Sequence, residues 1–281
     1  MDWSKAKTIL IIAFLITNIL LVVILFSSEK QIETTIEEAF VEDVIKLLNK
    51  KKIFVDTEIP KFIPNLNTVT VEYEIISPDE VNKIFFNGKG NIESNGYDIV
   101  NIMYEDECVL ITNKKRLVYE NNSKINKYPE LNENKVRDIA LDFLKDNQFN
   151  ISDTQLSYIF EKDSIYYLEF TDLYNEKYLE ISNIIMEIDY RGVRSLERLH
   201  LNPLEEGETP IYINTAPKAL LSLLNKEDVY GKTIKEISLC YYFNPESHEY
   251  IKDPKQAKKG KTIPAWRVLF DDGYKVIIDN Y

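Results

Sequence analysis

Residues 263–279 read IPAWRVLFDDGYKVIID, two apolar runs separated by a short polar stretch. The dipeptide Asp272-Gly273 between the runs is a strong hairpin signal, because both residues tolerate the positive φ angles that tight turns need. The stretch therefore predicts two antiparallel strands, near 263–270 and 274–279. Asp271 and Asp272 are interpreted as turn residues rather than as a catalytic carboxylate pair.

The sequence before this hairpin shows the same plan twice, a helix followed by antiparallel strands. One helix is expected from Thr215, a capping residue, to about residue 224, and a strand near 233–243 follows it. An earlier helix is expected over 133–146. Its apolar face consists of Val136, Ile139, Ala140, Phe143 and Leu144. The strands expected after this helix lie near 155–161, 165–172, 177–189 and 193–201. A polar, lysine-rich insertion is expected over 244–262.

Residues 27–130 predict a further region of mixed elements. An amphipathic helix is expected over 31–50 and a strand over 68–76. Ser77-Pro78-Asp79-Glu80 reads as a capping box, and the helix that it begins should end at Asn87-Gly88. Three strands should follow, near 97–104, 107–112 and 115–119, with a tight hairpin at Asn113-Lys114.

Thr8 to Phe26 form an uncharged stretch of 19 residues. As a helix it would be roughly 28 Å long, close to the thickness of the hydrocarbon core of a bilayer. The stretch is longer than the apolar region of a signal peptide, and Ser27-Ser28-Glu29 after it lacks a small-residue cleavage pattern. We therefore expect an uncleaved transmembrane helix. Lys5 and Lys7 lie closer to it than the basic residues on its other side, which favours a cytoplasmic N-terminus.

These observations predict an α+β protein with a single N-terminal transmembrane helix followed by helix-plus-antiparallel-meander units. We expect the helices to cover one face of the sheets. The expected divisions are a cytoplasmic N-terminus at 1–7, the transmembrane helix at 8–26, a membrane-proximal α+β region at 27–130, and two helix-plus-meander units at 131–205 and 206–281.

Three residues in the expected span suggest a contact with another membrane helix. Ala13 and Thr17 are four residues apart, a small-residue pair that lets a second helix approach closely. Asn18 lies near the middle of the span, where an amide without a partner is costly. The alternative is that Thr17 bonds to its own backbone and that Asn18 is tolerated in a locally hydrated membrane. The sequence does not choose between these two interpretations.

The composition and the missing motifs favour binding over catalysis. A net charge of −12 argues against nucleic acid, whose phosphates require clustered Lys and Arg. His200 and His248 have no partner at a metal or triad spacing, so each is interpreted as a lone surface histidine. Cys108 and Cys240 lie in apolar runs and are interpreted as buried thiols, although a disulfide between them is not excluded. We expect no enzyme activity, no metal and no cofactor.

Two segments resemble the YycI family of Gram-positive bacteria. The first is Met1-Asp2-Trp3-Ser4-Lys5-Ala6-Lys7-Thr8-Ile9, and the second is Ile263-Pro264-Ala265-Trp266-Arg267-Val268 followed by Asp271-Asp272-Gly273. The order of the expected elements fits this family over essentially the whole chain.

The resemblance implies a protein of the cell membrane, in contact with membrane lipid, whose bulk lies outside the cell. It also implies association with a YycH-like protein and with the sensor histidine kinase WalK (YycG), in a pathway that controls cell-wall metabolism. The alternative is an extracytoplasmic module that binds a ligand or the cell wall without contacting a kinase.

Overall fold

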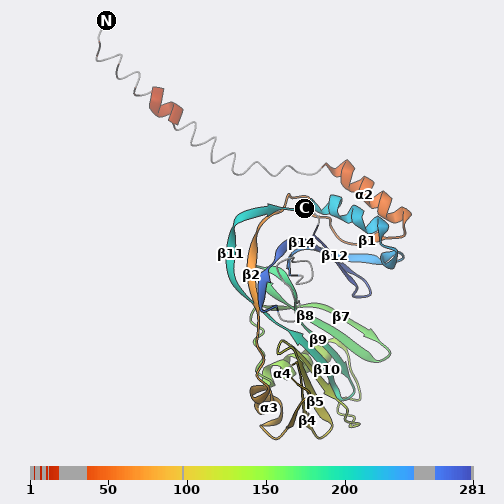
Figure 1. Ribbon diagram of the computed structural model, residues 1–281. Helices are drawn as coiled ribbons and strands as arrows, with labels where there is room; N and C mark the ends of the chain where they lie inside the picture. The colour runs from red at the N-terminus through yellow and green to blue at the C-terminus, as the bar shows by residue number, and fades with distance from the viewer. Residues whose placement is uncertain are drawn as a thin grey trace.

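Strands dominate the computed structural model, which describes residues 3, 7, 11, 13–18, 37–96, 98–243 and 257–279 (Figure 1). The strands are β1 (Phe54–Val55), β2 (Asn65–Tyr73), β3 (Asn91–Ser94), β4 (Ile99–Tyr104), β5 (Glu107–Thr112), β6 (Arg116–Asn121), β7 (Thr154–Lys162), β8 (Ile165–Tyr174), β9 (Lys177–Asp189), β10 (Gly192–Leu199), β11 (Leu201–Tyr212), β12 (Thr233–Tyr242), β13 (Lys259–Lys261), β14 (Ile263–Phe270) and β15 (Lys275–Ile278). The α-helices are α2 (Glu38–Lys50), α3 (Pro78–Phe86), α4 (Glu133–Asp146) and α5 (Ala216–Leu220), and 3₁₀ turns follow at Leu221–Asn225 and Glu227–Val229.

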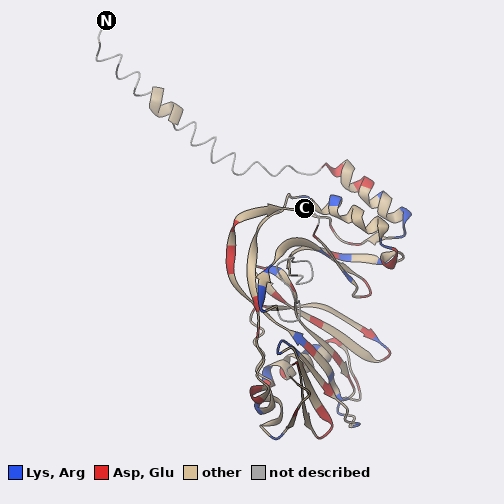
Figure 2. Ribbon diagram, in the orientation of Figure 1, with Lys and Arg blue, Asp and Glu red and all other residues tan. Residues whose placement is uncertain are grey.

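One continuous sheet runs through most of the molecule. Its strand order is β15-β14-β12-β9-β10-β6-β5-β4-β3, with β1 beside β12 and with β8 and β7 branching from β9. Most neighbours are antiparallel, but β12 pairs with β9 in parallel. A second, three-stranded sheet has the order β11-β2-β13 and forms the curved arch in Figure 1. Glu205, Glu206 and Glu208 give the arch strand β11 its acidic character (Figure 2).

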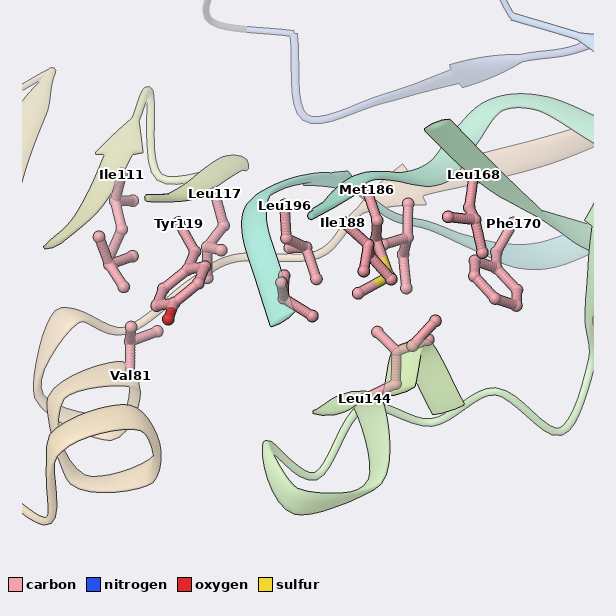
Figure 3. Close-up of a cluster of buried hydrophobic side chains, with 14 of the residues drawn as sticks. Val81, Ile111, Leu117, Tyr119, Leu144, Leu168, Phe170, Met186, Ile188 and Leu196 are labelled. Carbon is pink, nitrogen blue, oxygen red and sulfur yellow. The ribbon is translucent and has the colours of Figure 1, made fainter. Parts of the chain in front are cut away.

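The α3/α4 lobe comprises α3, α4 and strands β3 to β10. Its core lies between the two helices and one face of the sheet. In Figure 3 the sheet residues Tyr119, Leu196 and Met186 point toward the helices, and Val81 of α3 and Leu144 of α4 point toward the sheet. This face of the sheet is therefore covered by helices, as in other layered folds.

The α2/α5 lobe comprises α2, β1, α5, the two 3₁₀ turns, β12, β14 and β15. Val44 and Leu48 of α2 are buried against Leu220 of α5 and against Trp266 and Phe270 of β14. The apolar stripe predicted for 31–50 is confirmed at Val44 and Leu48. Phe40, which was expected on the same stripe, is exposed, and Val41 is buried instead. Residues 31–36 lie outside the described part of the chain.

Local sequence signals place the ends of α3 and α4 correctly. Ser77 caps α3 by accepting a hydrogen bond from the Glu80 amide, and Asn87 ends the helix in the left-handed conformation with φ of 51°. α4 has the predicted bounds, 133–146, with Asn132 as its cap. The predicted apolar face of α4 is confirmed by the burial of Val136, Ala140 and Leu144.

Tight turns join the antiparallel strands where the sequence predicts them. Asn113 and Lys114 both have positive φ, the geometry of the turn type that matches the right-handed twist of paired strands. The C-terminal hairpin forms as predicted. Its Gly273 has φ of +80°, and Asp272 Oδ1 accepts a hydrogen bond from the Tyr274 amide. Asp271 and Asp272 are therefore confirmed as turn residues.

The predicted fold class is wrong. The α+β layout of helix-plus-meander units does not form, because strands from different parts of the chain join one predominantly β structure. β6 pairs with β10 over Arg116–Glu120, and β9 pairs with β12 over Tyr178–Glu180. The helix expected from Thr215 to residue 224 is only five residues long before it tightens into 3₁₀ turns.

The structure also differs from the prediction of a single N-terminal transmembrane helix. Among the residues that the structure describes, no helix is long and apolar enough to cross a membrane. Of the predicted span 8–26, the described residues are Ile11 and 13–18, and the remainder lies outside the described part of the chain.

Strand β11 was not predicted, because its sequence lacks strand-like alternation. It contains Pro203 and Pro210, neither of which can donate an amide hydrogen bond, and three exposed glutamates. The strand forms because β2 pairs with it along its length, with two irregularities in register. An edge position tolerates this composition, because one side of an edge strand needs no partner.

Candidate functional site

The predicted membrane-contact residues make bonds within their own helical turn. The Thr17 hydroxyl donates to the Ala13 carbonyl at 2.9 Å, and the Asn18 amide donates to the Phe14 carbonyl at 3.0 Å. The Thr17 bond is the one that the alternative interpretation describes. All of these residues are exposed, and their role in a helix contact stays a prediction.

The two lobes meet at a joint that contains a buried network of charged side chains. Arg267 of β14 is inaccessible to solvent, and its Nε donates to Glu180 Oε1 of β9 at 2.8 Å. Its Nη1 lies 3.1 Å from Glu236 Oε1 of β12, without the alignment of a hydrogen bond. Its Cζ lies 4.2 Å from the centre of the Tyr178 ring, so an aromatic face covers the guanidinium.

Lys275 of β15 extends this network toward the α3/α4 lobe. Its Nζ donates to Glu180 Oε2 at 2.9 Å and also to Glu169 Oε1 of β8. The network thus contains three carboxylates and two cations from five strands. Burial alone would lower the pKa of Arg267, but the neighbouring carboxylates, Glu180 first, outweigh it and raise that pKa. Arg267 therefore keeps its charge, and its network links strands of the two lobes.

A second polar cluster surrounds Asp172 near the end of β8. His200 Nδ1 lies 2.7 Å from Asp172 Oδ2, the Ser182 hydroxyl donates to the same oxygen at 2.6 Å, and the Thr154 hydroxyl donates to Oδ1 at 2.7 Å. Ser182 in turn accepts the Leu201 amide at 2.8 Å. The cluster therefore fixes the point where the chain leaves β10 and enters β11.

The pKa of Asp172 is set by two opposing effects. Burial would raise it, but the hydrogen bonds from His200, Ser182 and Thr154 together outweigh burial and lower it below its ordinary value. Asp172 is consequently a carboxylate at neutral pH and fixes the orientation of the His200 ring. The second ring nitrogen, Nε2, has no hydrogen-bond partner within the described ranges, and the side chain is partly exposed.

A polar cleft lies beside this cluster. It consists of two adjoining cavities, of about 360 and 330 Å³, that share His200, Asn150 and Asn202 in their walls. One cavity also includes Asp153 and Tyr174, and the other extends to Arg198, Phe149 and the N-terminal turn of α3. Arg198 is already paired with Glu74 and lies over the Phe149 ring.

The Asp172 cluster does not have the geometry of a nucleophilic triad. In a triad the histidine bridges the serine and the carboxylate, whereas here Ser182 and His200 bond to the same carboxylate oxygen. Within the described residues, no three His, Cys, Asp or Glu side chains are placed to hold a metal ion. The arrangement can orient an imidazole toward a polar ligand in the cleft.

The interpretation of His200 as a lone surface histidine is wrong. Its partner Asp172 is 28 positions away in the sequence, and no motif links the two residues. Ser182 reaches Asp172 next to Ile181, whose positive φ of 70° interrupts the regular pairing of β8 and β9. A sequence pattern does not reveal such a bulge. His248 lies outside the described residues.

Both cysteines are free thiols. Cys240 is fully buried on β12, as predicted, and its hydrogen-bond acceptor is the Ala265 carbonyl. Cys108 is only half-buried, because it lies on the face of β5 that the helices do not cover. Burial raises the pKa of each thiol, most strongly that of Cys240.

Comparisons with known proteins give structural likenesses only. No family model matches the sequence. No curated protein matches it either. A crystal structure of an uncharacterized protein from Eubacterium rectale is 13% identical, with a TM-score of 0.49 over 85% of this chain and 96% of that one.

Two further solved structures are similar. YycH from Bacillus subtilis is 14% identical, with a TM-score of 0.49 over 77% of this chain, and the match spans 53% of the YycH chain. The YpeB C-terminal domain from Bacillus megaterium is 12% identical, with a TM-score of 0.40 over 87% of this chain and 93% of that one. At these identities and TM-scores the likenesses assign neither a family nor a function.

Proposed function

We propose that this chain is an extracytoplasmic regulatory protein that acts by binding other proteins at the cell membrane rather than by catalysis. Its proposed partners are a YycH-like protein and the sensor histidine kinase WalK (YycG), whose pathway controls cell-wall metabolism. The observation that supports the proposal is the resemblance of residues 1–9 and 263–273 to the YycI family. The second segment forms β14 and contributes Arg267 to the joint between the lobes.

The joint suggests how binding could be coupled to signalling. Only three residue pairs connect β9 with β12, and the charged network around Arg267 supports this short ladder. A protein that binds to both lobes would therefore favour one arrangement of the lobes relative to each other. A binding partner shifts a kinase between two states only through a difference in its affinity for them. The proposed regulation accordingly requires that the chain bind one state of the kinase more tightly.

Co-purification of the full chain with the kinase and the YycH-like protein in detergent tests the partners. The test variant replaces Thr17 and Asn18 with Leu, and the control variant replaces Ile11, in the same stretch, with Leu. We expect the double variant to recover less of both partners and the control to recover as much as the natural chain. Equal recovery by both variants would refute the contact through Thr17 and Asn18, and failure of the natural chain to recover either partner would refute the proposed function.

Protease treatment of intact protoplasts tests the proposed location. If the bulk of the chain is extracellular, residues 37–279 are expected to be digested without lysis. Protection until the protoplasts are lysed would contradict this location. Digestion of a purified, folded sample under the same conditions is the control, because a compact domain resists proteolysis on its own.

The polar cleft beside His200 favours a second candidate function, the binding of a soluble ligand or of cell-wall material. Asparagine amides, an oriented imidazole and the Tyr174 ring are groups that bind neutral polar ligands. Calorimetric titration of the full chain with soluble cell-wall fragments tests this candidate. Binding that His200→Gln weakens would support it, and no detectable binding to the natural chain would refute it.

A further inference from the structure

The sheet of the α3/α4 lobe has a second face that α3 and α4 do not cover. Side chains alternate between the two faces of a strand. Ile102, Val109 and Met186 lie in the core beneath the helices, so the residues next to them in sequence point to the opposite side. The open face of β4, β5, β6, β10 and the adjoining part of β9 can therefore be mapped from the strand register.

Four large apolar side chains on this open face are exposed. Ile99 and Met103 of β4 are 42% and 38% exposed, Leu110 of β5 is 36% exposed and Ile185 of β9 is 41% exposed. The half-buried Val118 of β6 lies between Leu110 and Ile185. We call these five residues the open-face strip.

The strand register aligns the open-face strip across the sheet, with one interruption at Glu197 of β10, which is paired with Arg116. Leu110 pairs directly with Val118, and Val118 pairs with Glu197, which pairs with Ile185. Ile99 and Met103 flank Asn101, the partner of Leu110 on β4, so both are diagonal neighbours of Leu110. The strip thus has apolar members on β4, β5, β6 and β9, and it spans the intervening strand β10. At about 4.8 Å between neighbouring strands, it is roughly 19 Å long.

The charges around the strip are mainly negative. Glu93, Glu120, Glu187 and Glu197 lie on the same face as the strip, as their cross-strand partners show. Arg116 neutralises Glu197 through two hydrogen bonds, and Arg194 lies 3.4 Å from Glu187. Glu93 and Glu120 have no cationic partner among the described residues. An apolar strip with uncompensated carboxylates at its edges is complementary to an apolar surface flanked by cations.

We propose that the open-face strip is a docking site for an amphipathic helix of another protein, with an apolar ridge flanked by Lys or Arg. A strip of roughly 19 Å matches a helix of about 13 residues, and a helix is the element that already packs on the other face of this sheet. A second copy of this chain is a poor occupant, because two chains with a net charge of −12 repel each other. The inference goes beyond the proposed function, since it requires no kinase.

Methionine methyl groups provide an internal probe for this site. The sequence contains three methionines, Met1, Met103 and Met186. Met103 lies in the open-face strip, whereas Met186 is fully buried on the opposite face of the same sheet. The full chain labelled at its methionine methyl groups is titrated with a peptide of about 14 residues that carries Leu on one face and Lys or Arg beside it. We expect the Met103 resonance to shift with saturation while Met186 and Met1 stay unchanged.

Two variants and two peptides complete the test. Leu110→Glu should weaken binding at least about tenfold, because it places a charge in the centre of the apolar contact. Leu141→Glu is the matched control and should leave the affinity unchanged, since Leu141 is similarly exposed, at 42% against 36% for Leu110, but lies on α4. A peptide with Glu in place of Lys and Arg, and a scrambled peptide with the same composition, should each bind at least about tenfold more weakly than the basic amphipathic peptide.

Three results of the peptide titrations would overturn the inference. They are no shift of Met103 with the basic amphipathic peptide, equal losses from Leu110→Glu and Leu141→Glu, and equal affinity for the acidic peptide. Conversion of a dimer to a monomer by Leu110→Glu in sedimentation would assign the strip to a second copy instead. Binding of the peptide by a chain that does not co-purify with the kinase would uphold this inference while the proposed function fails.

Discussion

Replacing Arg267 with Met should strongly destabilise the protein. The substitution keeps a long side chain but removes the 2.8 Å bond to Glu180, the 3.1 Å ion pair with Glu236 and the contact with the Tyr178 ring. Removing one partner of a buried ion pair costs about 3–5 kcal/mol, because the remaining charge stays buried. Lys275 still bonds to Glu180 at 2.9 Å, so we expect about 3 kcal/mol, the lower end of that range.

An exposed pair in the same chain provides the matched control. Arg116 also bonds to a carboxylate, Glu197, through two nitrogen atoms, at 2.6 and 2.5 Å, but half of its side chain is exposed. Solvent weakens such a pair, so Arg116→Met should cost about 0–1 kcal/mol. Urea unfolding followed by tryptophan fluorescence measures both losses. Trp266 is buried next to Arg267, whereas the other tryptophan, Trp3, is already exposed and contributes a constant background.

Equal losses for Arg267→Met and Arg116→Met would contradict this expectation, because burial of the ion pair would then make no difference. A further variant separates lost charge from lost packing. Adding Glu180→Gln to Arg267→Met removes one of the two carboxylates that lose the guanidinium, so part of the stability should return. Further destabilisation by Glu180→Gln would show that Glu180 is held mainly by Lys275.

Three other outcomes follow from particular side chains. The pKa of the Asp172 carboxyl is lowered on folding. The stability that this carboxylate contributes is therefore complete above its unfolded pKa of about 3.9 and is lost as the pH falls through its folded pKa. Between about pH 5 and 3, the urea midpoint of Asp172→Asn should therefore fall less than that of the natural chain. In the folded chain a thiol reagent at neutral pH should modify Cys108 slowly and Cys240 not at all, and both rapidly in urea, as mass spectrometry of the peptides would show. Gly273→Ala should cost at least about 2 kcal/mol by urea unfolding, because φ is +80° and the added methyl group would lie 2.2 Å from Tyr158 Cε1.

Little of the candidate site could be predicted from the sequence. The sequence predicts a strand near 263–270, which forms, but no pattern indicates that Arg267 is buried in a network of charges. An arginine within an apolar run can be identified as a buried charge only when its carboxylate partners are known. The partners of Arg267 lie on other strands, so their positions depend on the order of the sheet.

The local features of this protein follow from short stretches of its sequence. The cap at Ser77, the bounds of α4, and the turns at Asn113-Lys114 and Asp272-Gly273 depend on residues within a few positions of one another. Such contacts form in almost any context, because they need only the backbone angles and hydrogen bonds of one turn.

The strand order, the predominance of sheet, the charged joint and the open-face strip depend on long-range contacts. These features join residues far apart in the chain. Lys275 and Glu169 are 106 positions apart, Arg267 and Glu180 are 87 apart, and His200 and Asp172 are 28 apart. Alternation of apolar and polar residues shows that one face of a strand is apolar, but it does not specify which strand lies beside it. The reason is that the backbone hydrogen bonds between two strands are the same whatever their side chains.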